Sequence, residues 1–311
     1  MAAPHRFLPL FAAALIAAIA LAPAPTLAGL LLDRLKARQS ERQTPKPAPS
    51  GATILRDIAY GSDSRETLDV YLPPSKTSGA PLIFMVHGGG WRIGDKGHDK
   101  VVNNKTARWL PRGFIFISIN YPMLPQADPL HQADSVARAL AYAQRHAAEW
   151  GGDGARFVLM GHSAGAHLVA LLNANPALAQ GAQPWLGTIS LDSGALDVAP
   201  IMKARHLALY DDAFGKDEDF WRRASPLQIL TPLAPPLLMV CSSRRTDSCP
   251  QAEALARKAK NLGALASVLP ENLSHSEINE TLGLSNAYTE SVEAFMASLD
   301  PHIKVLLPRD R

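Results

Sequence analysis

Continuous apolar runs and helix-spaced apolar residues alternate along most of the chain. Strand-like runs of the kind buried on both faces of a sheet lie at residues 82–86, 114–119, 157–160, 188–191, 236–241 and 266–269. Apolar residues recur at helical spacing over 132–150, and helices are also predicted at 251–262 and 287–299. Two shorter runs at 54–59 and 68–72 predict a hairpin of edge strands. The alternation predicts an α/β fold with a mostly parallel sheet that carries helices on both faces.

The alternation stops between residues 202 and 223. Charged and aromatic residues dominate there, as in Tyr210-Asp211-Asp212-Ala213-Phe214 and Phe220-Trp221-Arg222-Arg223. A segment without strand or helix periodicity, placed between two strands of a sheet, is typical of an excursion over the sheet. We therefore expect a small cap at 200–224.

The amino terminus has the pattern of an export signal. His5 and Arg6 precede an apolar stretch at 7–22, and small residues follow up to Ala28, where cleavage is expected. The apolar stretch is shorter than the roughly 20 residues that span a bilayer, so no stable membrane span is predicted. The predicted organisation is a signal peptide at 1–28, an amphipathic and proline-rich linker at 29–51, a catalytic domain at 52–300 and a tail at 301–311. The expected location is the periplasm or the outside of the cell.

Composition narrows the function further. The chain has 311 residues, of which 47% are hydrophobic, and its formal net charge is +3. No run of five basic residues occurs, so nucleic acid is not an expected partner. Cys241 and Cys249 are the only cysteines. In an oxidising compartment they are expected to form a disulfide, and the alternative is two free thiols.

A G-x-S-x-G motif follows the apolar run at 157–160 and opens a helix-like segment. A strand that passes through such a motif into a helix is the sequence form of a nucleophile elbow. The serine sits on a sharp, strained turn, and the flanking positions must carry almost no side chain. Gly161 and Gly165 meet this demand, which makes Ser163 the candidate nucleophile.

A serine nucleophile also needs hydrogen-bond donors for the oxyanion that forms on its substrate. The segment His87-Gly88-Gly89-Gly90-Trp91 directly follows the apolar strand at 82–86. Consecutive glycines let a backbone approach a ligand closely and present amide groups to it. We expect the amides of Gly89, Gly90 and Ala164 to form the oxyanion hole.

The base and its orienting carboxylate are expected late in the chain, in the order serine, acid, histidine. His275 follows the last strand through a short loop and precedes a helix-like stretch, so it is the predicted base. Asp247 lies in the loop after the strand at 236–241 and is the predicted acid. Asp192 and Asp197, after the preceding strand, are the alternatives.

These motifs together resemble the α/β-hydrolase fold, and within it the esterase group that is similar to hormone-sensitive lipase, kynurenine formamidase and bacterial feruloyl and acetyl-xylan esterases (BD-FAE-like). The resemblance covers about residues 52–299. It departs from the group in the loop at 241–247, where a His-Gly or similar pair usually precedes the acid. The matching pieces are His87-Gly88-Gly89-Gly90-Trp91, Asn120-Tyr121, Gly161-His162-Ser163-Ala164-Gly165, Ala224-Ser225-Pro226 and the pair Asp247 and His275.

The residues and the resemblance imply a secreted serine esterase with a Ser163-His275-Asp247 triad and no cofactor or metal. Its expected partner is a small-molecule or carbohydrate ester, such as a short-chain acyl, aryl or acetylated-sugar ester. Trp91, Tyr121 and His162 are the candidate substrate-binding residues. Two alternatives are an amide hydrolase of the kynurenine-formamidase type and a catalytically silent hydrolase fold used for binding.

Overall fold

The computed structural model describes residues 51–307. All of them belong to one of the two compact units into which the chain divides, the unit of residues 43–311. The predicted signal peptide at 1–28 and nearly all of the predicted linker at 29–51 lie outside the described residues.

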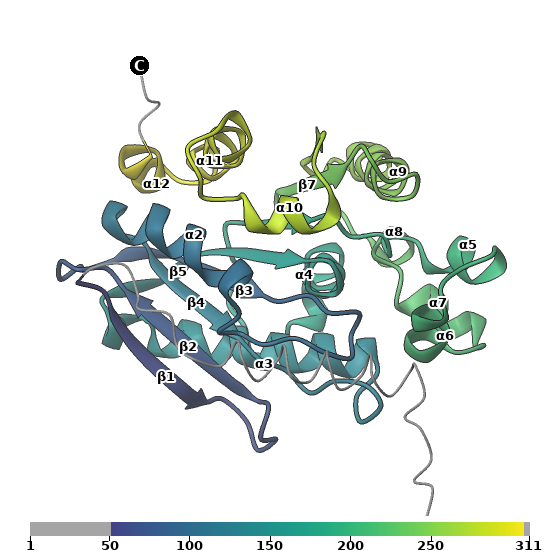
Figure 1. Ribbon diagram of the computed structural model, residues 1–311, viewed down its shortest axis with the longest axis horizontal. Coiled ribbons are helices and arrows are strands. Elements are labelled where there is room, and N and C mark those ends of the chain that lie inside the picture. Colours follow the sequence, from purple (N-terminus) through teal and green to yellow (C-terminus); the bar gives the residue numbers. More distant parts are fainter. Residues whose placement is uncertain (1–50, 308–311) are drawn as a thin grey trace, which may run out of the picture. The chain divides into compact units, whose positions relative to one another are not determined.

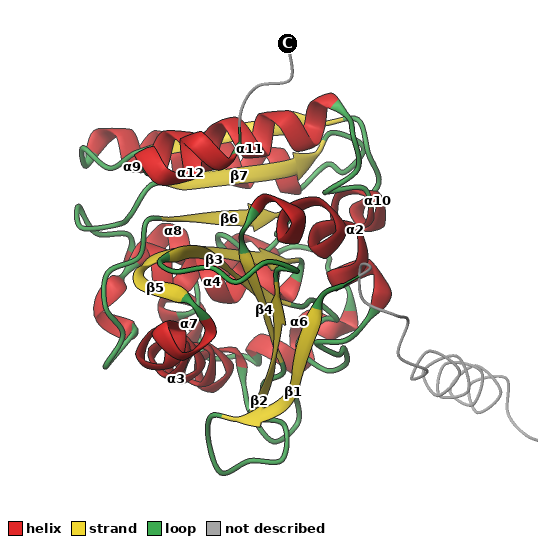
Figure 2. Ribbon diagram, turned by 90° about the vertical axis from the view of Figure 1, so that its left-hand side faces the viewer, coloured by secondary structure: helices red, strands yellow, loops and turns green. Residues whose placement is uncertain are grey.

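Within residues 51–307, eight strands form one sheet in the order β1-β2-β4-β3-β5-β6-β7-β8 (Figures 1 and 2). β1 and β2 pair antiparallel, as does β2 with β4, and all the other neighbours are parallel. The predicted hairpin is therefore present, but of its two strands only β1 lies at an edge of the sheet. The strands are β1 (Thr53–Ala59), β2 (Thr67–Leu72), β3 (Ala80–Val86), β4 (Ile115–Ile119), β5 (Gly152–His162), β6 (Gly187–Leu191), β7 (Leu237–Ser242) and β8 (Ala266–Glu271).

Helices cover both faces of the sheet. In β3, Leu82 and Phe84 pack on the side of α3 and α4, whereas Ile83 and Met85 pack on the side of α2 and α11. Because side chains alternate across a strand, a strand covered on both faces must be apolar throughout, which explains the continuous runs. The helices of these two layers are α2 (Asp99–Trp109), α3 (Pro129–His146), α4 (Ala164–Ala174), α9 (Ser248–Asn261), α10 (His275–Glu280), α11 (Ala287–Leu299) and α12 (Pro301–Leu306).

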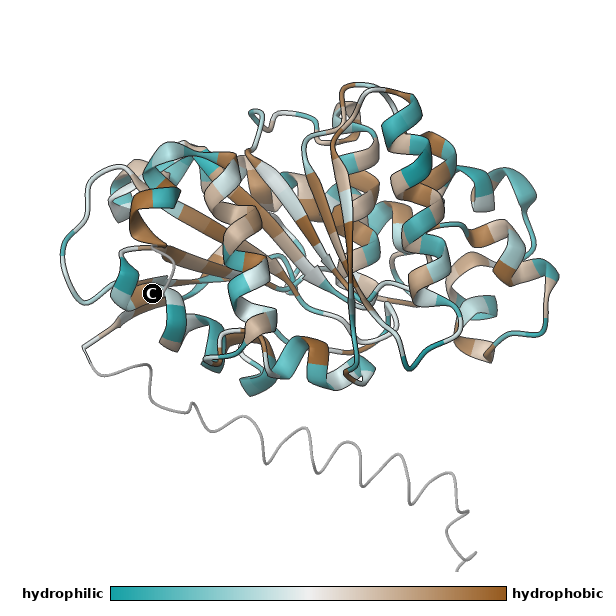
Figure 3. Ribbon diagram, turned by 90° about the horizontal axis from the view of Figure 1, so that it is seen from above, coloured by the Kyte–Doolittle hydropathy of each residue, from teal (hydrophilic) through white to brown (hydrophobic). Residues whose placement is uncertain are grey.

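Figure 1 shows α2, α11 and α12 on one side of the sheet and α3 on the other. Figure 3 shows hydrophobic colour concentrated on the strands, whereas the surrounding helices carry both colours. In the part of the chain that the structure describes, three short 3₁₀ helices lie between the larger elements, at Leu110–Arg112, Ala147–Trp150 and Pro176–Leu178. The predicted α/β fold with a mostly parallel sheet is confirmed.

Two of the helices that cover the sheet within residues 51–307 were not predicted from the sequence. α2 lies between β3 and β4, where its apolar residues are widely spaced. The second is α12, which forms the first part of the predicted tail at 301–311 and packs on the domain. Asp300 accepts hydrogen bonds from the amides of His302 and Ile303, Pro301 occupies the first turn, and Ile303 is fully buried. A helix of six residues is too short to show apolar periodicity in the sequence.

The segment between β6 and β7 forms short helices beside the carboxyl ends of the strands (Figure 1). Phe214 and Trp221 are buried in it, and the Trp221 indole donates to the carbonyl of Phe214. An ion pair of 2.7 Å between Arg92 and Asp212 joins this segment to the loop after β3. Its helices are α5 (Val198–Lys203), α6 (Ala208–Phe214), α7 (Glu218–Arg223) and α8 (Pro226–Ile229).

No helix within residues 51–307 has the length and apolar content needed to cross a bilayer. In the same residues, no group of three or more His, Cys, Asp or Glu side chains is arranged to hold a metal ion.

Candidate active site

Ser163 occupies the turn between β5 and α4. Its φ is 56° and its ψ is −118°, a conformation that non-glycine residues rarely adopt and that surrounding structure must enforce. A Cβ on Gly161 would collide with the carbonyl of Gly165, and a Cβ on Gly165 would collide with the carbonyl of Val86. The tight crossing of strand and helix therefore requires both glycines, as the elbow motif predicts.

The imidazole of His275 lies between Ser163 and a buried carboxylate. Its Nε2 is 2.9 Å from Ser163 Oγ, and its Nδ1 is 2.6 Å from Asp192 Oδ2. His275 is the first residue of α10, directly after the N-cap Ser274, whose side chain and that of Glu277 form a capping box. The cap fixes the start of the helix, and with it the backbone that carries the imidazole.

The acid at His275 is Asp192, so the prediction of Asp247 is corrected. Asp192 directly follows β6, its amide donates to Val240 O at 2.8 Å, and its side chain is fully buried. Asp247 instead binds Arg245 through both carboxylate oxygens, at 3.1 Å to Nε and 2.8 Å to Nη2, and its side chain is 43% exposed. The loop after β7 turns its guanidinium, rather than its carboxylate, toward the histidine.

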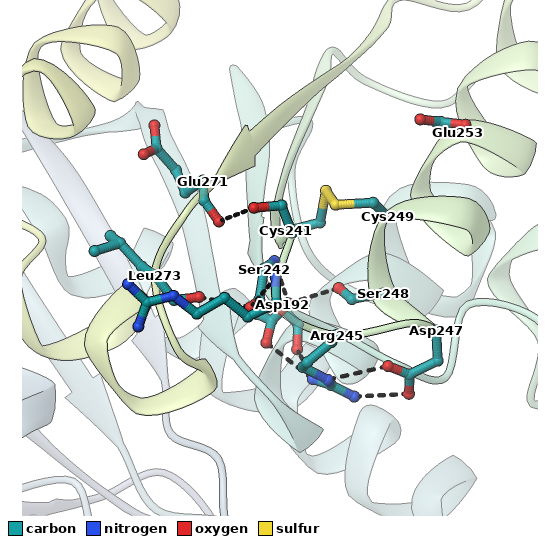
Figure 4. The surroundings of a disulfide bond; sticks show 12 residues. Asp192, Cys241, Ser242, Arg245, Asp247, Ser248, Cys249, Glu253, Glu271 and Leu273 are labelled. Atoms are coloured by element: carbon teal, nitrogen blue, oxygen red, sulfur yellow. Dashed lines mark hydrogen bonds and ion pairs between the residues drawn. A yellow bond between two sulfur atoms is a disulfide. The ribbon is translucent and has the colours of Figure 1, made fainter.

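The Asp192 carboxylate accepts hydrogen bonds on both oxygens. Oδ1 accepts from the Ser242 amide at 2.7 Å and from Ser248 Oγ at 2.6 Å, and Oδ2 accepts from His275 and from Arg245 Nη1 at 2.9 Å (Figure 4). Burial acts to raise the pKa of this carboxyl. The donors and the guanidinium charge outweigh burial and hold the pKa of Asp192 well below its usual range. Asp192 therefore stays ionised.

A disulfide joins the two segments that supply the donors to Asp192 Oδ1. Cys241 lies in β7 next to Ser242, Cys249 lies in α9 next to Ser248, and the two sulfurs are bonded (Figure 4). The bond ties the end of β7 to the first turn of α9. It thereby fixes the spacing of the two serines on either side of the carboxylate.

The predicted oxyanion-hole residues lie around the nucleophile. Gly89, Gly90 and Ala164 line a cavity of about 560 Å³ together with Ser163 and His275. Among the described residues, none of these three amides donates a hydrogen bond to another protein group. The φ angles of Gly89 and Gly90 are 125° and 59°, in the region that favours glycine.

Two stacked rings, those of His87 and Tyr121, hold the backbone of the glycine loop in place. His87 Nδ1 donates to Gly88 O at 2.7 Å, and the Tyr121 hydroxyl donates to His87 O at 2.9 Å. The two rings stack at 4.6 Å. Tyr121, predicted to bind substrate, is fully buried and is not among the residues that line the cavity. Its role is to hold the backbone of the loop.

Trp91 and His162 both line the cavity, as predicted. The Trp91 indole donates to His167 Nδ1 at 3.1 Å, which fixes the ring at the cavity wall. His162 Nε2 donates to the carbonyl of His275 at 2.9 Å. Burial, followed by the charge of His275, lowers the pKa of His162 to about 3, so this ring is neutral near pH 7 and braces the histidine backbone.

The cavity has further walls that the sequence did not reveal. Leu207, Leu209 and Tyr210 come from the segment predicted as a cap, and Gly194 and Arg245 come from the loops after β6 and β7. The only signal in the sequence was the charged and aromatic content of 202–223. Nothing in the local pattern marked Arg245.

Three side chains of α2 hold the helix that carries His275. Lys105 Nζ donates to Asn279 O at 2.6 Å, Asn104 Nδ2 donates to Glu280 O at 2.6 Å, and Lys100 Nζ donates to Ser276 Oγ at 3.1 Å. The first two bonds satisfy carbonyls at the end of α10 that have no partner within the helix. Burial lowers the pKa of Lys105 to about 7.

Comparison with known structures shows the same fold. A carbohydrate esterase from gut microbiota superposes with a TM-score of 0.69 at 18% identity, covering 82% of this chain and 99% of that one. Esterase B from Lactobacillus rhamnosis gives a TM-score of 0.67 at 19% identity, covering 89% of this chain and 93% of that one. The chain has the α/β-hydrolase fold. The fold predicted from its motifs is confirmed.

Sequence comparison places this α/β-hydrolase near the esterase group that its motifs resemble. The BD-FAE family matches residues 68–184. The esterase LipQ of Mycobacterium tuberculosis is 31% identical over 232 residues, which cover 69% of this chain and 54% of that protein. A probable isoprenylcysteine alpha-carbonyl methylesterase of Oryza sativa is 33% identical over 117 residues, covering 38% of this chain and 27% of that protein.

Kynurenine formamidase of Danio rerio is 27% identical over 186 residues, which cover 60% of each protein. The α/β-hydrolase described here thus spans between about a quarter and three-fifths of the length of these curated relatives. The predicted resemblance to the group is confirmed.

Proposed function

We propose that this α/β-hydrolase cleaves carboxylic esters through an acyl-enzyme intermediate on Ser163. The observation that carries the proposal is the hydrogen-bonded series from Ser163 Oγ through His275 to the buried Asp192. The names of the relatives support ester chemistry, since LipQ and the rice protein are both named as esterases.

In the first half-reaction, His275 Nε2 takes the proton of Ser163 while Oγ attacks the ester carbonyl carbon. The imidazolium then gives this proton to the departing alcohol, leaving an acyl group on Ser163. In the second half-reaction, His275 deprotonates a water molecule that attacks the acyl carbon. The acid leaves and the serine hydroxyl is restored. The Asp192 carboxylate holds the Nδ1–H tautomer and stabilises the imidazolium in both halves.

The amides of Gly89, Gly90 and Ala164 are the donors for the oxyanion in both tetrahedral intermediates. Their lack of other partners supports this role, because a donor already engaged elsewhere cannot bind developing charge without cost. Removal of one such donor typically costs about 10²–10³ in rate, so the glycine loop makes a large part of the proposed catalysis.

The cavity walls support a small substrate with an apolar part. Trp91, Leu207 and Leu209 provide apolar surface, and Tyr210 adds a hydroxyl group. Short-chain acyl, aryl and acetylated-sugar esters are the proposed substrates. The formamidase relatives keep amide cleavage as the second candidate. A catalytically silent hydrolase is the third, although the serine, histidine, acid and unpartnered amides are all present together.

Side-by-side turnover of esters and a formamide tests this proposal. We expect purified enzyme to hydrolyse p-nitrophenyl acetate or butyrate at least 10²-fold faster, in kcat/KM, than an N-formyl arylamine. The small cavity should also reduce the rate for long acyl chains. Faster cleavage of the formamide would favour an amide hydrolase. No turnover of any substrate would favour a catalytically silent hydrolase fold.

We also propose that the enzyme is exported to the periplasm or secreted. The charged and apolar pattern at 1–28 supports export, as does the Cys241–Cys249 bond, since such bonds persist in oxidising compartments. Amino-terminal sequencing of the protein recovered from its native cells checks this, with Gly29 expected as the first residue. An intact Met1 would contradict cleavage.

A further inference from the structure

Arg245 lies between two carboxylates beside the base. Its Nη1 is 2.9 Å from Asp192 Oδ2, and its Nε and Nη2 bind both oxygens of Asp247 (Figure 4). The Asp192 side chain is fully buried, whereas that of Arg245 is 24% exposed and reaches the cavity wall. The guanidinium thus connects the buried acid to a carboxylate at the surface.

The same guanidinium also touches the base itself. Arg245 Nη1 is 2.9 Å from His275 Nδ1, the nitrogen that lies 2.6 Å from Asp192 Oδ2. When Nδ1 carries a proton and donates it to Asp192, it has no lone pair to accept a bond from Arg245. The contact between Arg245 and His275 is then one between a cation and a ring that must become a cation during catalysis. A like charge at this distance opposes protonation of the ring.

Asp247 offsets this effect because it binds Arg245 through two parallel hydrogen bonds, the geometry in which a guanidinium and a carboxylate pair most strongly. The pair packs against Gly194, where a Cβ would lie 2.9 Å from Asp247 Oδ2 and would clash with Arg245 Nη2. A glycine at this position lets the pair sit directly over the start of the loop that carries Asp192.

We propose that Arg245 and Asp247 are positioning residues, a charge pair that sets the pH range over which His275 can act as the base. This inference rests on the proposed ester hydrolysis at Ser163. Arg245 orients Asp192 and disfavours the imidazolium, while Asp247 balances the cation. The other titratable groups around His275 are Asp192 after β6, His162 at the end of β5, Tyr210 on α6, Lys100 and Lys105 on α2, and Glu277 and Glu280 on α10.

The two residues should shift the pH profile in opposite directions. In Arg245→Gln the imidazolium loses a repelling cation, so the midpoint of the acid limb of kcat/KM should rise by about one pH unit. In Asp247→Asn the cation is no longer balanced, so the midpoint should fall by about half a unit. The double variant should lie between the two single variants. A purely structural role would lower the rate without separating the two midpoints.

Arg244→Gln is the matched control. Arg244 is adjacent in sequence and also cationic, but its side chain binds Glu277 and Asn272 at the surface and does not contact Asp192. The midpoint of the acid limb of kcat/KM in Arg244→Gln should stay within about 0.2 pH units of that of the unmodified enzyme. Arg245→Lys should retain most of the wild-type midpoint, because it keeps the charge although it loses the two-pronged geometry.

Asp247→Asn tests the inference even where Arg245→Gln fails to fold, since the Asp247 side chain is 43% exposed and Arg245 keeps its bond to Asp192. Equal shifts for both residues, or no shift for Asp247→Asn, would overturn the inference. The imidazole titration of His275, followed by NMR in the same variants, does not depend on turnover. If the His275 titration shifts in opposite directions in the two variants but the protein hydrolyses no ester, the charge-pair inference holds and the proposed function is rejected.

Discussion

Asp192→Asn is expected to lower kcat for ester hydrolysis by about 10⁴-fold, whereas Asp247→Asn should cost less than about tenfold near the pH optimum. An asparagine at 192 can present an amide to Nδ1, which favours the wrong tautomer and removes the charge that stabilises the imidazolium. Asp192 is buried and hydrogen-bonded to His275, while Asp247 reaches the base only through Arg245. Steady-state kinetics of the two variants with a p-nitrophenyl ester measures the difference.

Asp197→Asn is the control for this comparison. Asp197 was the other alternative acid after β6, but in the structure its carboxylate binds Gln228 at 3.2 Å and does not contact His275. Its replacement should leave kcat within about twofold. A large loss in Asp247→Asn together with a small loss in Asp192→Asn would contradict the structural assignment of the acid.

Ser163→Ala is expected to lower kcat by about 10⁶-fold, the largest effect of any single substitution in this chain. The hydroxyl is the atom that forms the bond to the acyl carbon, and no other group in the site replaces it. Some acceleration over water, about 10³–10⁴-fold, should remain because the oxyanion donors and the cavity are still present. Turnover at high enzyme concentration, after removal of any contaminating esterase, measures the loss.

Two checks accompany the Ser163→Ala measurement. Thermal unfolding should show little loss of stability. Alanine keeps the packing of the turn, and the substitution removes only one partly buried hydrogen bond. Ser243→Ala is the matched serine variant, since Ser243 is exposed and its hydroxyl binds only Glu271 O at 3.1 Å. It should keep full activity. Residual activity of more than about 1% in Ser163→Ala would show that another group is the nucleophile.

The fold was predictable because its signals are local. Strands covered on both faces must be apolar at every position, so β3, β4 and β5 stood out as continuous runs. The elbow was equally visible, since Gly161 and Gly165 are required by contacts with backbone atoms. α12 was missed because six residues are too few to show a helical period, and its burial depends on Ile303 meeting residues from elsewhere in the chain.

The acid was not predictable because chain order allows it after either β6 or β7. Both loops end at the same edge of the sheet, and both carry an aspartate within reach of the last histidine. The choice depends on the conformation of residues 243–247, which turns Arg245 inward and Asp247 outward. The buried position of Tyr121 was not predictable for a similar reason. Its position after a strand placed it near the site, but only the three-dimensional packing shows it beneath the glycine loop.

The measurement that tests the central claim most directly is mapping of a covalent adduct. The enzyme is treated with a fluorophosphonate, and its peptides are analysed by mass spectrometry. We expect one adduct per chain, on the peptide that contains Ser163, with no labelling of Ser163→Ala and slow labelling of His275→Ala. An unlabelled wild-type enzyme, or an adduct on any other residue, would contradict the assignment of Ser163 as the nucleophile.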